Sequence, residues 1–423
     1  MLKNLKLGTM KIKTSLLIAV WVITWNCLSA QELSEEQLRF LGNSAVSLGI
    51  DSISPSDEFS TVQSEIGNKR MVLIGEFNHG SKEVFLIRNE LIKYLHQQAG
   101  FDVILFEAGI GELIHPEFNK DQFSPAQLTS GFFGPWRTKE FRGLMQYIKE
   151  NKLSIAGFDA QRTGRSFETI LSAAANDAKL DVETYEDLET QFGTLKSILP
   201  NRKIEYNDSL KEQTLKLIDG YEKVYNQLLL SKLSLSLKKS LLILKTIQNR
   251  IGFLTYMLEF KIDQDWNKRW AARDSMMADN VKWLAETIYS GKKIIVVGHN
   301  FHISKYNEKE QVMGEYLLPH YSNDMYSIGI YAKTGTFLSN YGHEETMKPS
   351  DSLNLDIKHI INALKNEVNF LPIPKEKQPG SEWLFQAIIT NDTFVDLSNS
   401  NTTVLSENYD GLILLQHIST PDK

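Results

Sequence analysis

Histidines and glutamates in this chain occur in two short strings that each follow an apolar run. The first string holds Glu76 and His79, and the second, far along the chain, holds His299 and His302. A histidine that a neighbouring carboxylate orients can take a proton from water near neutral pH. The chemistry that these residue types favour is therefore general acid–base catalysis, with His79 as the base.

The apolar runs before the two strings, at residues 71–74 and 294–297, are typical of buried strands. A third apolar run, at 102–108, reaches Glu107 near its end. In an open α/β sheet, ligands bind at the carboxyl ends of the parallel strands. A single histidine at a strand end is more often structural than catalytic, but acids and histidines at three strand ends favour one shared site. We therefore predict that these side chains converge on one cleft.

Two other polar residues have more than one interpretation. Arg88 lies on the helix expected after the first string, and we predict that it assists the catalytic residues. The alternative for Arg88 is an ion pair with Glu83 or Glu90 on the same helix. His302 is expected to contact the substrate, and its alternative is a capping or supporting role.

An aromatic stretch lies between the second and third expected strands. Its aromatic residues are Phe132, Phe133 and Trp136. Together they are suited to line an apolar pocket, so we predict that they bind the substrate. The alternative is that they belong to the core, as aromatic side chains in α/β proteins often do.

Strands and helices alternate along most of the chain, which predicts an α/β fold with a mostly parallel central sheet flanked by helices. Further strands are expected at 154–159, 326–332, 334–338 and 412–416, and helices at 80–98, 139–150 and 265–289. From 167 to 260 the pattern changes to long amphipathic segments. We predict a core, 31–166 and 261–423, that is interrupted by an inserted helical subdomain or lid at 167–260. The alternative is a set of helices that packs on the sheet without a role in binding.

Residues 1–30 form a separate unit at the amino terminus. Four lysines precede an apolar stretch at 16–25, and small residues follow at 28–30, which is the pattern of a secretory signal peptide. The apolar stretch is shorter than the roughly 20 residues of a spanning helix, so a membrane anchor is the less favoured alternative. We expect a secreted or periplasmic protein that keeps no stable membrane anchor after the leader is cleaved.

Cysteine content and charge exclude several function classes. The only cysteine, Cys27, lies in the leader, so the mature chain has no cysteine nucleophile, disulfide or thiolate metal site. The formal charge of −6 becomes −10 when the four lysines of the leader are lost, which disfavours nucleic acid as a partner. No Gly-x-Ser-x-Gly elbow occurs, so a serine hydrolase triad of the usual α/β type is not indicated. The expected partner is a small molecule.

The spacing of the acids and histidines resembles that of the erythromycin esterase family, hydrolases that open the macrolactone ring of macrolide antibiotics. The first block of the resemblance consists of Gly75, Glu76, His79, Glu83, Arg88, Phe101 and Glu107. The second block consists of Arg273, Asp274, Met277, Ala278, Asn280, His299, Asn300, His302, Met313 and Gly314. The resemblance covers most of the mature chain and is weakest across the helical insertion.

What the resemblance implies is a metal-independent esterase, without a cofactor, in which His79 activates water. Glu76, Glu107 and His299 would orient that base or the substrate and polarise the lactone carbonyl. Arg88 would assist them. The expected function is an exported hydrolase of an ester or macrolactone, an activity that would confer macrolide resistance.

Two other functions fit the same residues. A metal-dependent hydrolase would use the histidine and glutamate cluster as ligands for zinc or manganese. A noncatalytic cell-envelope binding protein would keep the scaffold without the reaction, because fold alone does not determine function.

Overall fold

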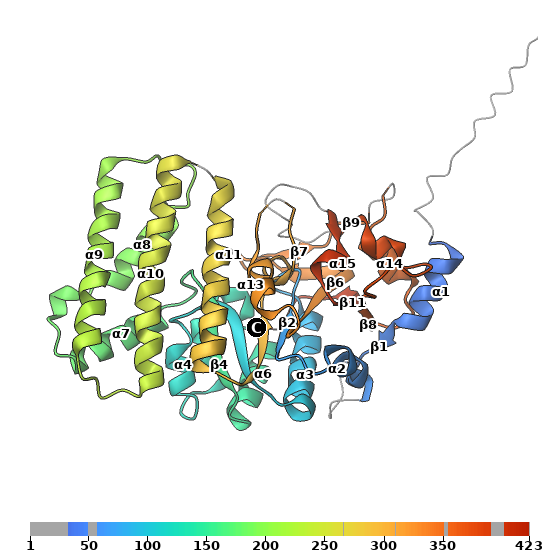
Figure 1. Ribbon diagram of the computed structural model, residues 1–423, viewed down its shortest axis with the longest axis horizontal. Helices are drawn as coiled ribbons and strands as arrows, with labels where there is room; N and C mark the ends of the chain where they lie inside the picture. Colours follow the sequence, from blue (N-terminus) through green and yellow to red (C-terminus); the bar gives the residue numbers. More distant parts are fainter. Residues whose placement is uncertain are drawn as a thin grey trace, which may run out of the picture.

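The computed structural model describes residues 33–49, 57–264, 266–308, 310–350, 354–390 and 402–422, except the side chains of residues 184 and 266–270. A sheet lies at the centre of the molecule, and a group of long helices stands to one side of it (Figure 1). The leader expected at 1–30 lies outside the described residues. Among the helices described, none combines the length and the apolar character that crossing a membrane requires.

Strands of the described residues form one large sheet and one small one. They are β1 (Val46–Ser47), β2 (Met71–Ile74), β3 (Phe101–Gly109), β4 (Ser154–Asp159), β5 (Lys293–Val297), β6 (Met325–Leu338), β7 (Glu344–Thr346), β8 (Val368–Pro372), β9 (Ala387–Ile389), β10 (Thr402–Val404) and β11 (Gly411–Ile418). The large sheet has the order β1-β8-β11-β6-β2-β5-β3-β4, with β7 beside β6, and β9 pairs with β10. The pairs from β11 to β4 are parallel, and those of β8 and β7 are antiparallel. The predicted α/β fold with a mostly parallel central sheet is confirmed.

The register of the three central strands brings their carboxyl ends to one edge of the sheet. Ile74 of β2 lies opposite Val297 of β5, and Val297 lies opposite Phe106 of β3. All of β2 is buried, as its apolar sequence predicts for a strand with neighbours on both sides. The residues that follow these positions, among them Glu107 and His299, are therefore neighbours in space.

The strands predicted from the sequence differ from the observed ones in two ways that bear on the sheet. The strands expected at 326–332 and 334–338 are one strand, β6, which continues past the sheet to pair with β7. Gly335 permits this course at a φ of 131°, because a Cβ there would lie 1.8 Å from the carbonyl oxygen of Ile418. β8 was not predicted from the sequence; it is a short strand with antiparallel neighbours on both sides, β11 and β1.

The helices cover the sheet and form the group at its side. Among the described residues they are α1 (Glu35–Ser44), α2 (Ser60–Ile66), α3 (Lys82–Ala99), α4 (Ile114–Phe118), α5 (Pro125–Leu128), α6 (Lys139–Glu150), α7 (Ser166–Asp177), α8 (Leu188–Ile198), α9 (Asp208–Leu230), α10 (Leu237–Asp263), α11 (Trp266–Trp283), α12 (Asn300–Ile303), α13 (Met313–Tyr321), α14 (Ile357–Ala363) and α15 (Leu405–Asn408). The buried face of α3 carries the apolar residues whose spacing predicted that helix, Val84, Ile87, Leu91 and Leu95. α3 is capped at its carboxyl end by Gly100, which adopts the left-handed conformation at a φ of 73°.

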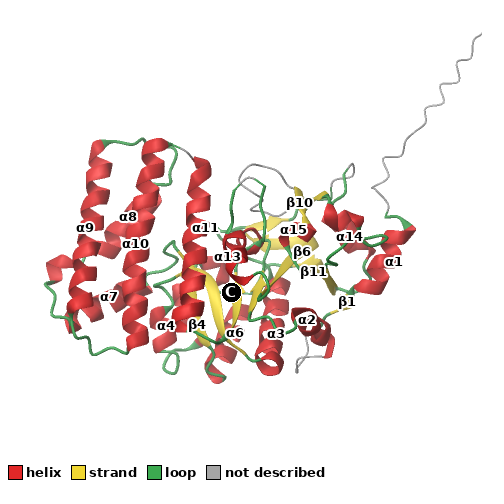
Figure 2. Cartoon of the chain, viewed as in Figure 1, coloured by secondary structure: helices red, strands yellow, loops and turns green. Residues whose placement is uncertain are grey.

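Helices α7 to α10 stand together beside the sheet, and we call these four helices the helical group (Figure 2). α9 packs on α10, and α10 packs on α11, which in turn contacts β4 and α13. α11 therefore connects the helical group to the sheet, at the strand that ends in Asp159. The division of the chain into a core and a lid stays a prediction.

Candidate active site

The loop from β2 to α3 follows a tight course between two glycines. A Cβ on Gly75 would lie 2.0 Å from Oδ1 of Asn300, and a Cβ on Gly80 would lie 2.1 Å from the carbonyl oxygen of Leu338. Between them, Oδ1 of Asn78 accepts the backbone N–H of Gly80 at 3.0 Å. Only glycine allows such close approach at both ends, so the loop holds its acid and its histidine in one arrangement.

His79 and Glu76 form a buried pair in this loop. Nδ1 of His79 lies 2.6 Å from Oε1 of Glu76. A carboxylate at Nδ1 favours the tautomer with its proton on that nitrogen, so the lone pair of the neutral ring is on Nε2. His79 is 8% exposed and lines a cleft. This pair has the arrangement of a general base and the group that orients it.

Glu76 accepts two further hydrogen bonds from behind the loop. Nη1 of Arg88 donates to Oε2 at 2.6 Å, and Nε1 of Trp136 donates to Oε1 at 3.0 Å. Burial by itself raises the pKa of Glu76, but the Arg88 guanidinium and the His79 ring outweigh burial and hold that pKa below its ordinary value. Glu76 therefore stays ionised. Arg88 is fully buried and pairs with Glu76, so the alternative of an ion pair within α3 is wrong.

Glu107 and His299 meet at the next two strand ends. Oε2 of Glu107 accepts the backbone N–H of His299 at 2.7 Å. Nδ1 of His299 accepts the N–H of Phe301 at 3.2 Å, at the start of α12. Burial lowers the pKa of His299 well below its ordinary value, and the nearby His79 and His302 rings lower it further. His299 is therefore a neutral imidazole, with its ring centroid 5.4 Å from that of His79.

Arg273 of α11 ties together two carboxylates from neighbouring strands. Its Nη2 donates to Oε1 of Glu107 at 3.2 Å and to Oδ2 of Asp159 at 2.7 Å. Its Nε donates to Oδ1 of Asp159 at 3.1 Å. Burial alone raises the pKa of Asp159, but the Arg273 guanidinium outweighs it and lowers that pKa. The end of β4 thus joins the ends of β2, β5 and β3 in one polar cluster.

His302 lies between an acid and this cluster. Its Nδ1 is 2.7 Å from Oδ1 of Asp274, and its Nε2 is 3.1 Å from Nη1 of Arg273 and 3.5 Å from Oε1 of Glu107. Burial alone lowers the pKa of His302, but Asp274 and Glu107 outweigh it and raise that pKa. In the neutral ring Nε2 accepts from Arg273, whereas the protonated ring forms an ion pair with Glu107.

The cleft has a volume of about 370 Å³, which is within the range of small-molecule sites. It is lined by His79, Glu107, Phe133, Asp159, Gln161, Arg162, Thr163, Lys196, Arg273, His299, Phe301, His302 and Asn340. Four residues predicted from the strand ends, His79, Glu107, His299 and His302, thus share one cleft. Glu76 and Arg88 support the cleft from behind His79 without lining it.

The aromatic residues predicted to bind the substrate are divided between the cleft and the core. Phe133 lines the cleft, with its ring centroid 4.7 Å from that of His79. Phe132 and Trp136 are fully buried, and their rings stack with centroids 5.7 Å apart. The Nε1–H of Trp136 donates to Glu76. The sequence does not show which of the three faces the cleft, because they lie on an irregular loop in which buried and exposed positions do not alternate regularly.

Several cleft residues were not selected from the sequence. Asp159 closes a strand that was expected, so the strand-end argument applies to it equally. Arg273 belongs to the second block of the resemblance, but nothing in its sequence surroundings indicates a cleft. Arg162 lies on the loop after β4, and Lys196 lies on α8. Only the tertiary fold brings these two side chains to the same site.

The polar cluster does not have the geometry of a metal centre. Within the described ranges, no three histidine, cysteine, aspartate or glutamate side chains are grouped so as to hold a metal ion. Two atoms that a metal would need at this end of the cleft, Nε2 of His302 and Oε1 of Glu107, both contact the guanidinium of Arg273. The residues as arranged do not fit the ligand set of a metal-dependent hydrolase.

Comparison with known sequences gives a family match and two close relatives. The model of the erythromycin esterase family matches residues 96–418, a range that begins after His79 and includes the other histidines and acids of the cleft. The putative hydrolase YbfO of Bacillus subtilis (strain 168) is 31% identical over 390 residues, which cover 83% of this chain and 84% of that protein. Erythromycin esterase type II of Escherichia coli is 26% identical over 323 residues, which cover 69% of this chain and 75% of that protein.

Solved structures share the fold at lower sequence identity. A protein of Bacillus cereus superposes with a TM-score of 0.70 at 21% identity, over 92% of this chain and 98% of that one. A mutant of the erythromycin esterase EreC in its open conformation superposes with a TM-score of 0.60 at 17% identity, over 93% of this chain and 98% of that one. These similarities show a common fold over nearly the whole chain.

Proposed function

The chain belongs to the erythromycin esterase family of hydrolases, and from that membership we propose that it cleaves a small-molecule ester or lactone with water activated by His79. The observation that carries the proposal is the buried pair of His79 and Glu76, 2.6 Å apart, at the wall of a cleft. The ionised Glu76 both fixes the tautomer of His79 and stabilises the imidazolium that forms when His79 takes a proton.

The reaction has two proton transfers, and both pass through the same nitrogen. Nε2 of His79 takes a proton from water as the water oxygen attacks the carbonyl carbon. The tetrahedral intermediate then breaks its bond to the alcohol oxygen, and the His79 imidazolium returns the proton to that oxygen. The products are a carboxylic acid and an alcohol, which for a lactone are two ends of one opened ring.

Two neighbours make the charges of this reaction easier to accommodate. Negative charge that develops on the carbonyl oxygen is stabilised by the guanidinium of Arg273, which lines the cleft and is fixed by Glu107 and Asp159. Because burial keeps His299 neutral, the imidazolium of His79 forms without a second positive ring beside it.

Substitution of the proposed base tests the mechanism. We expect His79→Ala to lower kcat for ester hydrolysis by about 10²- to 10⁴-fold, the usual contribution of a general base. The measurement is hydrolysis of a panel of simple esters, lactones and macrolides, followed by mass spectrometry as a gain of one water. His320→Ala, which changes an exposed histidine outside the cleft, is the control. Equal rates for wild type and His79→Ala would end the assignment of His79.

The metal-dependent alternative has its own test. We expect a preparation treated with a chelator, and shown to be metal-free by elemental analysis, to keep the full rate of ester hydrolysis. The physical reason is that the guanidinium of Arg273 already lies at Nε2 of His302 and Oε1 of Glu107, where a metal cation would have to lie. A rate that falls on chelation and returns with zinc or manganese would support the metal-dependent function instead. No hydrolysis of any compound in the panel would favour the noncatalytic binding protein.

We also propose that a macrolactone is among the substrates, that its hydrolysis confers macrolide resistance, and that the protein is exported. Support for the macrolactone is the similarity to the relative named erythromycin esterase type II. Support for export is the leader pattern at residues 1–30. The mass of the mature chain from the periplasmic or secreted fraction, and growth of producing cells on macrolides, test these points. A full-length mass in the cytoplasmic fraction alone would contradict export.

A further inference from the structure

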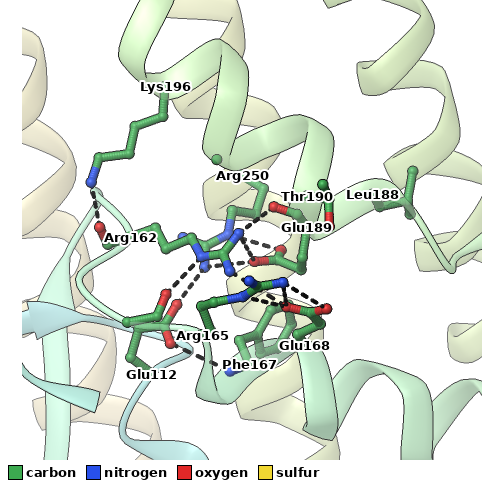
Figure 3. Close-up of polar contacts among 12 residues, drawn as sticks. Glu112, Arg162, Arg165, Phe167, Glu168, Leu188, Glu189, Thr190, Lys196 and Arg250 are labelled. Carbon is green, nitrogen blue, oxygen red and sulfur yellow. Dashed lines mark hydrogen bonds and ion pairs between the residues drawn. The ribbon is translucent and has the colours of Figure 1, made fainter. Parts of the chain in front are cut away.

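One end of the cleft is built by the helical group rather than by the sheet. Lys196, in the last turn of α8, reaches the cleft beside Arg162, which follows β4. Nζ of Lys196 donates to the carbonyl oxygen of Arg162 (Figure 3). An ammonium group from the helical group therefore shares the cleft with His79.

The other cations that line the cleft are balanced by carboxylates of the protein. Arg273 is paired with Asp159 at 2.7 Å, and a guanidinium nitrogen of Arg162 is 3.8 Å from Glu189. Among the described residues, no carboxylate forms an ion pair with Lys196. The carboxylate whose charge Lys196 feels most is Asp159, and both of its oxygens are occupied by Arg273. Among the described lysines and arginines of the cleft, Lys196 is thus the one without a paired carboxylate, and its ammonium has capacity for an outside anion.

Lys196 is also partly removed from water and held in place. It is half-buried, and burial lowers its pKa. α8 packs closely on the loop after β4, since a Cβ on Gly193 would lie only 3.1 Å from Nη1 of Arg162. A partly desolvated ammonium without a paired carboxylate is unfavourable, and an anion bound beside it would offset that energy.

We propose that Lys196 binds a carboxylate group carried by the ester substrate, so that the enzyme acts on esters with an anionic substituent. The carboxylate would accept a charge-assisted hydrogen bond from Nζ while the ester carbonyl lies at His79, on the wall of the same cleft. The identity of the reacting group rests on the proposed function, whereas the anion site does not depend on the reaction.

The experiment compares two phenyl acetates that differ only at the para position, 4-acetoxybenzoate with a carboxylate and 4-methylphenyl acetate with a methyl group. We expect wild type to prefer the carboxylate ester in kcat/KM. Lys196→Gln should lower the ratio of kcat/KM for the two esters by about 10- to 100-fold, the loss of one hydrogen bond between charged groups. Lys196→Arg, which keeps the charge, should retain much of the ratio. Lys203→Gln, which changes an exposed lysine on the loop between α8 and α9, outside the cleft, should leave the ratio unchanged.

Direct binding separates the anion site from the reaction. The probe is 4-acetamidobenzoate, whose amide resists hydrolysis, titrated into wild type and Lys196→Gln in a calorimeter. We expect about 10- to 100-fold weaker binding to the variant. If wild type hydrolyses neither these two esters nor any compound of the panel, but the probe binds in this way, the proposed function fails and the anion site stands. Equal affinities, or an ester ratio that Lys196→Gln leaves unchanged, would overturn the anion site and leave Lys196 as a group that only ties α8 to the loop after β4.

Discussion

His299 and His302 line the cleft beside His79, and their surroundings favour opposite charge states for these two rings. His299 is buried beside two other rings, which keeps it neutral, while Asp274 and Glu107 favour the protonated form of His302. His79 is held by an ionised glutamate at one nitrogen. Because a general base works only if it can change its charge without strong repulsion from its neighbours, a neutral His299 at 5.4 Å suits a His79 that becomes positive.

The raised pKa of His302 predicts a pH dependence of stability with a definite sign. A folded-state pKa above the unfolded value of about 6.5 adds stability that is fully present below that value and is lost as the pH rises through the folded pKa. We therefore expect the free energy of unfolding of wild type to exceed that of His302→Gln by more at about pH 6 than at about pH 9. Urea unfolding at the two pH values measures this difference.

Asp274 supplies the control for that measurement. It is the largest favourable influence on the charge of His302, so Asp274→Asn should reduce the pH dependence that His302 causes. A difference between wild type and His302→Gln that stays constant with pH, or grows toward pH 9, would show that His302 is not protonated in the folded protein.

At the scale of elements, the junction of β2 and α3 decides where the base lies. Its course depends on backbone contacts with other parts of the sheet, such as the approach of Gly80 to the carbonyl of Leu338. The Glu76 side chain at the same junction is held by Arg88 from α3 and Trp136 from the aromatic stretch. The position of the His79 ring is therefore set by packing around the loop as much as by the loop itself.

A methyl group at Gly80 should displace this junction. A Cβ there would lie 2.1 Å from the carbonyl oxygen of Leu338, so Gly80→Ala requires the backbone to shift. We expect a loss of about 1–3 kcal/mol in the free energy of unfolding and a fall in kcat of about 10- to 100-fold, because a small displacement of a catalytic group is enough to slow the reaction. Urea unfolding and ester hydrolysis measure the two effects.

Gly143 provides the matched control in α6. A Cβ at Gly143 meets nothing within 4 Å, so Gly143→Ala should raise the stability by about 0.5–1 kcal/mol through its helix propensity and leave kcat unchanged. A Gly80→Ala variant that behaves like Gly143→Ala would contradict the tight course assigned to the loop.

At the scale of the whole molecule, a buried ionic network joins the helical group to the sheet (Figure 3). Arg250 of α10 lies 3.1 Å from Glu112, which follows β3, and 3.1 Å from Glu189 of α8. Tyr221 of α9 donates to Glu189 at 2.7 Å. Arg250 and Glu112 have no solvent exposure. Arg162, whose carbonyl oxygen accepts from Lys196, belongs to the same cluster through Glu189. Through this network the helical group is positioned against the cleft.

Removal of Arg250 should destabilise the whole molecule. Arg250→Met leaves Glu112 buried without its paired guanidinium and leaves Glu189 with only the more distant Arg162, and breaking a buried pair in this way costs about 3–5 kcal/mol. Lys223→Met removes an exposed pair with Asp219 on α9, at 2.5 Å, and should change the stability by less than about 1 kcal/mol. Urea unfolding compares the two. A similar small effect for both variants would mean that the network does not hold the helical group to the sheet.

How far the sequence predicts this protein differs between its parts. The strands at whose ends Glu76, Glu107 and His299 stand were found because their apolar runs are continuous, as burial on both faces of a strand requires. β8 was missed because Asn369 interrupts its apolar run, although the residues from Val368 to Leu371 are all buried. Among the aromatic residues, Phe133 faces the cleft whereas Trp136 binds Glu76, and no periodic pattern separates them.

The sequence by itself determined the class of fold, the strand ends and the kinds of side chain that stand there, because these depend on local hydrophobic pattern and on the rule that parallel strands end at one edge. Only the tertiary structure decided which nitrogen of His79 is held, which histidine is neutral, and that Arg273 and Lys196 reach the cleft. These properties depend on distances between segments that are remote in the chain, and on how far each group is removed from water, and neither quantity is contained in a local pattern.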